Sequence, residues 1–246
     1  MSTKQEEMQV RKDRILSVTV QHYIHTVSPV SSQAIVQESR LDISSATVRN
    51  ILAELEKDGY LTHPHTSAGR IPTQRGYRYY VDNLMNDINL LKEEKDRIKA
   101  EYHKESSQLE DLLQRTSEVL SDATHYTSII SVDGWDRKIF CHGASYIVAY
   151  PDYHQDLRKI CDILKALEEK ERLLEIINRQ IRSKIKIYIG QEIACLPVDS
   201  CSLAVSCYKT RNGPSGRIAL LGPTRMNYEK VVSTLDYVSQ LMEEIF

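Results

Sequence analysis

Residues 41–81 read LDISSATVRNILAELEKDGYLTHPHTSAGRIPTQRGYRYYV, and this stretch decides what the first third of the chain forms. Ser44 and Ser45 can cap a helix, because a serine hydroxyl accepts a hydrogen bond from a free backbone N–H of the first turn. Gly59 is placed to end the helix. The apolar residues between these points are three and four apart: Val48, Ile51, Leu52 and Leu55. The stretch therefore predicts an amphipathic helix with one buried face.

The opposite face of this helix carries short or planar hydrogen-bonding groups, namely Ser45, Thr47, Arg49 and Asn50. Such groups suit base edges and phosphates. Downstream, residues 59–81 contain no Asp or Glu but hold three arginines and two histidines: Arg70, Arg75, Arg78, His63 and His65. A polar helix face followed by a cationic hairpin is typical of a winged helix-turn-helix that binds DNA.

The hairpin is expected to pair residues 60–63 with residues 70–73. Gly69 supplies backbone freedom, and the hydroxyls of Thr66 and Ser67 can donate hydrogen bonds to phosphate oxygens. Metal binding by His63 and His65, which are two residues apart on a strand, is disfavoured because no third ligand is near in sequence.

Two further helices precede this stretch. Apolar residues at helical spacing predict a first helix over about 8–26, ended by the turn Val27-Ser28-Pro29, and a short second helix over 31–39. Residues 41–43 form the expected tight turn into the third helix. The arrangement predicts a helix-turn-helix, with a plain three-helix bundle as the alternative.

Composition narrows the class of protein. The chain has 246 residues and a net charge of −2, so any DNA binding must come from a local basic patch rather than from bulk charge. Five cysteines without a CxxC pair indicate a reducing cytosol, and the cysteines at 195, 201 and 207 are expected to be buried thiols. The polar start and the lack of a long apolar run predict neither a signal peptide nor a membrane anchor.

Residues 84–123 step by alternating threes and fours without Pro or Gly. The positions are Leu84, Ile88, Leu91, Lys95, Ile98, Tyr102, Glu105, Leu109, Leu112, Thr116, Val119 and Ala123. This heptad pattern predicts one or two long helices. Two arrangements remain open: packing within the chain, or pairing with a second subunit.

The remaining residues predict a compact unit of mixed helices and strands. Strands are expected at 126–132, 186–189, 201–208 and 217–221, and residues 139–150 are mostly apolar. Amphipathic helices are expected over about 157–181 and 227–245.

Two runs carry a resemblance to a known family. Residues 44–85, SSATVRNILAELEKDGYLTHPHTSAGRIPTQRGYRYYVDNLM, resemble the N-terminal signature of the heat-inducible transcription repressor HrcA family. Residues 216–238, GRIALLGPTRMNYEKVVSTLDYV, resemble its closing segment. The resemblance implies a homodimeric repressor with a winged-helix domain and a GAF-like C-terminal domain. Its operator would be an inverted repeat upstream of chaperone genes, and the GroEL chaperonin would help to keep it active.

The same resemblance places the recognition helix on residues 44–55 and the wing on residues 63–73. Members of that family are usually longer. The shortfall here is expected between about Ser131 and Ala144, where the family carries much of its GAF-like sheet and an inserted dimerisation domain. The C-terminal domain is accordingly expected to be reduced.

The sequence thus predicts an α+β protein in three parts: a winged-helix domain at 1–81, linker helices at 82–124 and a reduced GAF-like domain at 125–246. It contains no nucleophile elbow, phosphate-binding loop or metal-ligand cluster, so we expect no enzyme, cofactor or metal. The expected function is a cytoplasmic, sequence-specific transcription repressor, with a ligand-sensing winged-helix regulator as the alternative. The expected DNA-binding residues are Ser44, Ser45, Thr47, Arg49, Asn50, His65, Thr66, Ser67, Arg70, Arg75 and Arg78.

Overall fold

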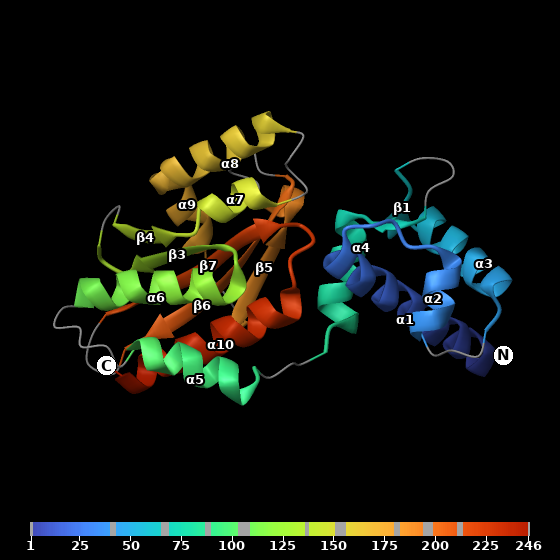
Figure 1. The fold of residues 1–246 in the computed structure, drawn as a ribbon, viewed down its shortest axis with the longest axis horizontal. Coiled ribbons are helices and arrows are strands. Elements are labelled where there is room, and N and C mark those ends of the chain that lie inside the picture. Colours follow the sequence, from blue (N-terminus) through green and yellow to red (C-terminus); the bar gives the residue numbers. More distant parts are fainter. Residues whose placement is uncertain are drawn as a thin grey trace. The chain divides into compact units, whose positions relative to one another are not determined.

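The computed structural model describes residues 2–39, 43–64, 69–86, 90–102, 109–135, 138–150, 156–179, 183–193, 199–210 and 214–245. The chain divides into two compact units, Met1–Asn86 and Asp87–Phe246 (Figure 1). Of the expected turn at residues 41–43, residues 41 and 42 lie outside the described residues. None of the described helices is long and apolar enough to cross a membrane.

The first unit contains the three expected helices, α1 (Ser2–Thr26), α2 (Ser32–Ser39) and α3 (Ser45–Lys57). The apolar stripe of α3 faces the core, and its members are at most 4% exposed: Val48, Ile51, Leu52 and Leu55. Gly59 ends the helix with φ of +78°, as its position predicted. Burial of one stripe against α1 and α2 therefore fixes which side of α3 remains in solvent.

Two short strands follow α3. Strand β1 (Leu61–Thr62) pairs antiparallel with β2 (Ile71–Pro72), which confirms the expected hairpin. Arg70 extends this pairing to Val30, because each backbone N–H donates to the other residue's carbonyl at 2.9 Å. Only glycine fits at position 69, where an added Cβ would lie 2.4 Å from the Val30 carbonyl oxygen.

The hairpin leads into α4 (Gln74–Tyr79), which continues as a π-helical turn, η1 (Tyr80–Leu84). Thr73 caps α4 by accepting a hydrogen bond from Gly76 N–H at 3.1 Å, and its hydroxyl donates to the Gly59 carbonyl at 2.7 Å. Tyr77 and Tyr80 are buried, so these rings pack α4 and η1 into the unit.

The second unit is built on an antiparallel five-stranded sheet in the order β4-β3-β7-β6-β5. Its strands are β3 (Thr127–Val132), β4 (Ile139–His142), β5 (Ile185–Ile189), β6 (Cys201–Lys209) and β7 (Ser215–Pro223). The expected strands at 126–132, 186–189, 201–208 and 217–221 are confirmed, and the 139–150 run gives β4 and the short helix α7 (Ser145–Ala149). The GAF-like sheet has five strands although the sequence is shorter than is usual for the resembled family.

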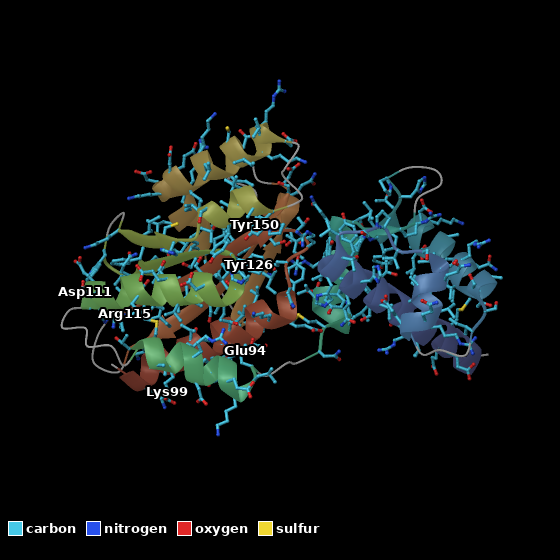
Figure 2. All side chains as sticks on the ribbon, viewed as in Figure 1. Glu94, Lys99, Asp111, Arg115, Tyr126 and Tyr150 are labelled. Carbon is cyan, nitrogen blue, oxygen red and sulfur yellow. The ribbon has the colours of Figure 1, made fainter. Side chains whose placement is uncertain are left out.

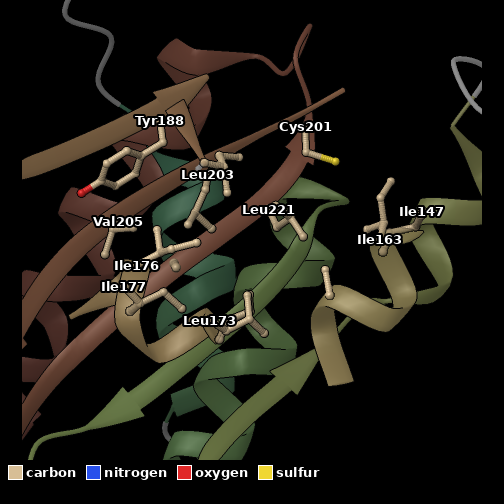
Figure 3. Packing of buried hydrophobic residues seen from close by; sticks show 14 of the residues in the cluster. Ile147, Ile163, Leu173, Ile176, Ile177, Tyr188, Cys201, Leu203, Val205 and Leu221 are labelled. Carbon is tan, nitrogen blue, oxygen red and sulfur yellow. The ribbon is translucent and has the colours of Figure 1, made fainter. Parts of the chain in front are cut away.

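One face of this sheet is covered by α7, α8 (Leu157–Glu168) and α9 (Lys170–Ile177). The contact is almost entirely apolar (Figure 3): Ile163, Leu173, Ile176 and Ile177 from the helices pack on sheet residues that include Leu203, Val205 and Leu221. The amphipathic pattern over 157–181 is confirmed over 157–177, with a break at Glu169.

The other face is covered by α6 (Leu109–Thr124) and α10 (Tyr228–Ile245). Hydroxyl groups are buried in this layer, such as Ser117 with Ser128 at 2.8 Å and Ser206 with Ser239 at 3.0 Å. Helix α5 (Lys92–Tyr102) packs against α6. The two helices of the heptad-patterned segment thus pack within the second unit of the same chain.

Candidate nucleic-acid interface

Two serines prepare the start of α3. Ser44 is the N-cap and accepts a hydrogen bond from Thr47 N–H at 3.1 Å, and Ser44 Oγ lies 3.0 Å from Thr47 Oγ1. Ser45 Oγ lies 3.0 Å from Ser32 Oγ and so links α3 to α2. These three expected contact residues therefore make internal hydrogen bonds that set the helix start.

Arg49 and Asn50 lie one turn further along and are exposed. Neither side chain forms a hydrogen bond or an ion pair with any residue that the structure describes. An arginine fork and a side-chain amide are the groups that pair in bidentate fashion with guanine and adenine in the major groove. Their donors and acceptors are thus presented to solvent, as a reading role requires.

Ala46 and Ala53 are also exposed, and sequence reasoning did not single them out. With Arg49 and Asn50 they form one helical stripe, which we call the reading stripe. Small side chains on either side leave the two long ones accessible and let a groove floor approach the helix. The sequence contained this signal, because these four positions are also three and four residues apart and fall on the face of the helix away from the apolar stripe.

Glu56 holds the base of the wing, and it too was missed. Its Oε2 forms an ion pair with Arg70 at 2.8 Å, and its Oε1 is hydrogen-bonded to His63 Nδ1. We call this arrangement the Glu56 clamp. Arg70 and His63 flank the tip of the hairpin, so one carboxylate of α3 joins both of its strands to the helix.

The Glu56 clamp and the reading stripe share one side of α3. Glu56 follows Arg49 by seven residues, which is about two helical turns, or roughly 10 Å along the axis. The wing base therefore lies on the same side of the helix as Arg49, about two turns further along. His65, Thr66 and Ser67, expected at the wing tip, lie outside the described residues.

Arg75 and Arg78 lie on α4. The Arg75 guanidinium stacks on the Tyr60 ring at 4.8 Å from its centroid, and Arg78 forms an ion pair with Asp82 at 3.2 Å. Arg75 also lines a groove beside the C-terminal end of α3, together with Lys57 and Asp58. Arg75 thus lies at the C-terminal end of α3, beyond the reading stripe.

Opposite charges meet in that groove. Lys12 of α1 forms ion pairs with Glu54 at 2.7 Å and with Asp58 at 3.7 Å. The hydrogen bond to Glu54 raises the pKa of Lys12 above its ordinary value, so the ammonium remains charged. Burial raises the pKa of Tyr79, and the hydrogen bond from its hydroxyl to Asp13 at 3.0 Å acts in the same direction.

Sequence comparison relates the chain to one group of proteins. Residues 131–232 match the family described as HrcA protein C terminal domain. The heat-inducible transcription repressor HrcA of Carboxydothermus hydrogenoformans is 28% identical, over 96% of this chain and 97% of that protein. The repressor of the same name from Geobacter sulfurreducens is 26% identical over the same shares. The first alignment has 333 positions, whereas this chain has 246 residues, so that relative contains residues with no counterpart here.

Structural comparison supports the fold. A crystal structure of a hypothetical protein superposes with a TM-score of 0.77 at 18% sequence identity, covering 95% of this chain and 97% of that one. The likeness extends over both units.

Proposed function

We infer that this chain belongs to the HrcA family of heat-inducible transcription repressors and represses heat-shock genes by binding DNA through its first unit. One observation carries the DNA-binding mode. Arg49 and Asn50 are exposed on α3 without a described partner, and the Glu56 clamp holds the wing on the same side of that helix. The second unit contributes no residue to this surface in our proposal.

The proposed contacts divide between base edges and the phosphate backbone. Helix α3 enters the major groove, where Arg49 binds a guanine edge and Asn50 an adenine edge. Ser45 and Thr47 hold the helix start against the phosphate backbone. At the wing, Arg70 with Thr66, Ser67 and His65 contacts phosphates or the minor groove. Arg75 and Arg78 contact phosphates from α4, where Tyr60 and Asp82 hold their guanidinium groups in place.

The repressor acts in the cytoplasm as a homodimer in this proposal. One winged-helix unit makes few base contacts, so tight binding requires two units on half-sites related by a two-fold axis. The operator is then an inverted repeat, and repression follows from occupation of promoter DNA. Heat or a shortage of the GroEL chaperonin relieves repression by depopulating the binding-competent dimer, as the family resemblance implies.

Selection of bound sequences from random duplex DNA tests this function directly. We expect a consensus with two inverted half-sites. A matched selection with Arg49→Ala should lose information at one base pair per half-site and retain the half-site spacing. A wild-type selection that enriches no sequence would contradict sequence-specific repression, and a single asymmetric site would contradict the dimer.

A second candidate function is a ligand-sensing regulator with the same first unit. The observation that favours it is a cavity in the second unit, which is described in the next subsection. The two functions are compatible, since a ligand could modulate a heat-shock repressor.

A further inference from the structure

A cavity of about 520 Å³ lies between α5, α6 and α10 of the second unit. Glu94 of α5 and Arg115 of α6, both labelled in Figure 2, are among the residues that line it. Binding sites for small organic molecules have volumes of about 300–1,000 Å³. The cavity therefore has the size of a ligand site, and all of its described lining comes from one unit.

Part of the cavity lining is apolar. Leu90, Ile98 and Val119 line it and are 8%, 4% and 8% exposed, and Ala123 lies beside them on α6. A wall of this kind favours a hydrocarbon or aromatic group, which leaves water when it binds.

Thr234 of α10 adds a polar group to this wall. Its side chain is fully buried, and its hydroxyl has no hydrogen-bond partner among the described residues. A helical threonine usually donates to the carbonyl four residues earlier, as Thr116 does to Leu112 at 2.8 Å and Thr124 does to Leu120 at 2.7 Å. A buried hydroxyl without a partner destabilises the free protein, and a ligand atom would supply that partner.

The charged residues around the cavity differ in whether they already have hydrogen-bond or ion-pair partners. Each of its carboxylates already accepts a hydrogen bond: Glu94 from Leu91 N–H at 3.0 Å, Glu118 from Gln114 at 3.0 Å and Asp122 from Tyr146 at 3.3 Å. Lys230 lies 3.8 Å from Glu94. Arg97 is exposed and forms no ion pair or hydrogen bond with any other described residue. Arg97 is therefore the charged lining residue whose hydrogen-bonding capacity is uncommitted among the described residues, and it is the group that we expect a ligand to engage.

We propose that this cavity binds a small carboxylic acid with an apolar body. The carboxylate pairs with the Arg97 guanidinium, whose planar fork matches it in bidentate geometry. The apolar body lies on Leu90, Ile98 and Val119. A second oxygen of the ligand, such as a hydroxyl or keto group, completes the hydrogen bonding of Thr234.

Such a ligand would strengthen the packing of α5 against α6 and α10. Among the α5 residues whose side chains are described, only Ile98 is buried. The contacts of Lys95 on α5 with Tyr237 on α10 are polar. The Tyr237 hydroxyl donates to the Lys95 carbonyl at 3.3 Å, and Lys95 Nζ lies 5.4 Å from the Tyr237 ring centre. A molecule between α5, α6 and α10 would add apolar contacts on all three helices. Because α5 begins six residues after the first unit ends, we expect occupancy to alter DNA binding, a consequence that rests on the proposed function.

The binding test uses the full chain without DNA. The probe is 1-anilinonaphthalene-8-sulfonate, an aromatic anion that fluoresces in apolar sites, and the competitors are decanoate, decanol and decylamine. We expect decanoate to displace the probe at lower concentration than decanol, and decylamine not to displace it. Arg97→Gln should weaken decanoate about tenfold or more, since it removes a charge-assisted hydrogen bond. Lys99→Gln is the matched control, because Lys99, labelled in Figure 2, lies on α5 and is not among the residues that line the cavity.

A second variant separates binding from folding. Thr234→Val preserves the side-chain shape and removes the orphaned hydroxyl, so its thermal unfolding temperature without ligand should be at least that of the wild type. The same variant should weaken 3-hydroxydecanoate more than decanoate if the hydroxyl contacts the ligand's second oxygen.

Several results would overturn the proposal. Equal displacement by decanoate and decylamine would show that the site does not select an anion. Equal effects of Arg97→Gln and Lys99→Gln would show that Arg97 does not bind the carboxylate. Probe binding that disappears as protein concentration rises would show that a second copy of the chain covers the cavity instead. If decanoate binds in the cavity but leaves DNA affinity unchanged, the site stands and only its regulatory consequence fails.

Discussion

The two ends of α3 use their polar side chains in opposite ways. Near its start, Arg49 and Asn50 extend into solvent without a described partner. Near its end, the acidic residues are all engaged by basic groups: Glu54 and Asp58 by Lys12, and Glu56 by Arg70 and His63. On this helix the two candidate base-reading side chains leave their donors uncommitted, whereas the acidic side chains position neighbouring elements. The helix therefore separates reading from positioning along its length.

Both ends depend on the same buried apolar stripe, so the largest loss of stability should come from truncating one of its side chains. Ile51 is 1% exposed, and Ile51→Ala should lower the free energy of unfolding of the first unit by about 2–5 kcal/mol, through lost burial and a residual cavity. Urea unfolding measures this loss. Ala53→Ser, on the exposed side of the same helix, is the control and should change stability by less than about 0.5 kcal/mol. Equal losses in both variants would mean that the stripe does not anchor α3.

The next largest effect should distinguish the reading end from the rest of the helix. Arg49→Ala should cost about 1–3 kcal/mol of binding free energy on the selected operator and little on random duplex DNA. Competition gel shifts with the two duplexes provide the measurement. Lys57→Ala removes an exposed cation from the other end of α3 and should affect both duplexes alike. Equal losses for Arg49→Ala on both duplexes would remove it from the reading role.

At the wing, Arg70→Ala should weaken binding to all sequences. It should also reduce the slope of log affinity against log salt by about one unit, because one phosphate contact is lost. Titrations at several salt concentrations measure the slope. An unchanged slope would show that Arg70 serves only the Glu56 clamp and does not contact the DNA backbone.

The smallest effect should come from opening the Glu56 clamp itself. The ion pair between Glu56 and Arg70 is partly exposed, with 25% of each side chain accessible, so Glu56→Gln should cost less than about 1 kcal/mol of stability. It also removes a negative charge beside Arg70, and affinity for random DNA should rise by about two- to fivefold. A fall in affinity would instead show that the clamp's main task is to position the wing.

Local patterns gave most of the fold. The 3–4 spacing of apolar residues predicted the core face of α3, and it also marked α8, α9 and α10. The β-branched and apolar runs predicted the strands, because side chains on a sheet alternate with a period that is visible in the sequence. The position of Gly59 marked the end of α3 for a local reason as well, since the left-handed backbone there favours glycine.

The heptad segment shows where a pattern alone is insufficient. Its spacing predicted helices but left open whether they pair within the chain or between subunits. The structure packs α6 on β3 and β4, where Leu113 and Leu120 are fully buried, and packs α5 on α6. A stripe of apolar residues specifies only that a face will be covered, since burial of apolar area has no preferred partner.

For the candidate site, sequence alone determined which residue types face outward on α3, because helical periodicity assigns every position to a face once the apolar stripe is known. Arg49 and Asn50 followed from that periodicity. Only the tertiary structure decided that Glu56 binds Arg70 and His63, that Arg75 stacks on Tyr60 away from the reading stripe, and that α5 closes a cavity against α6 and α10. These contacts join residues far apart in the chain or on separate elements, and their partners are chosen by the packing of whole helices and strands.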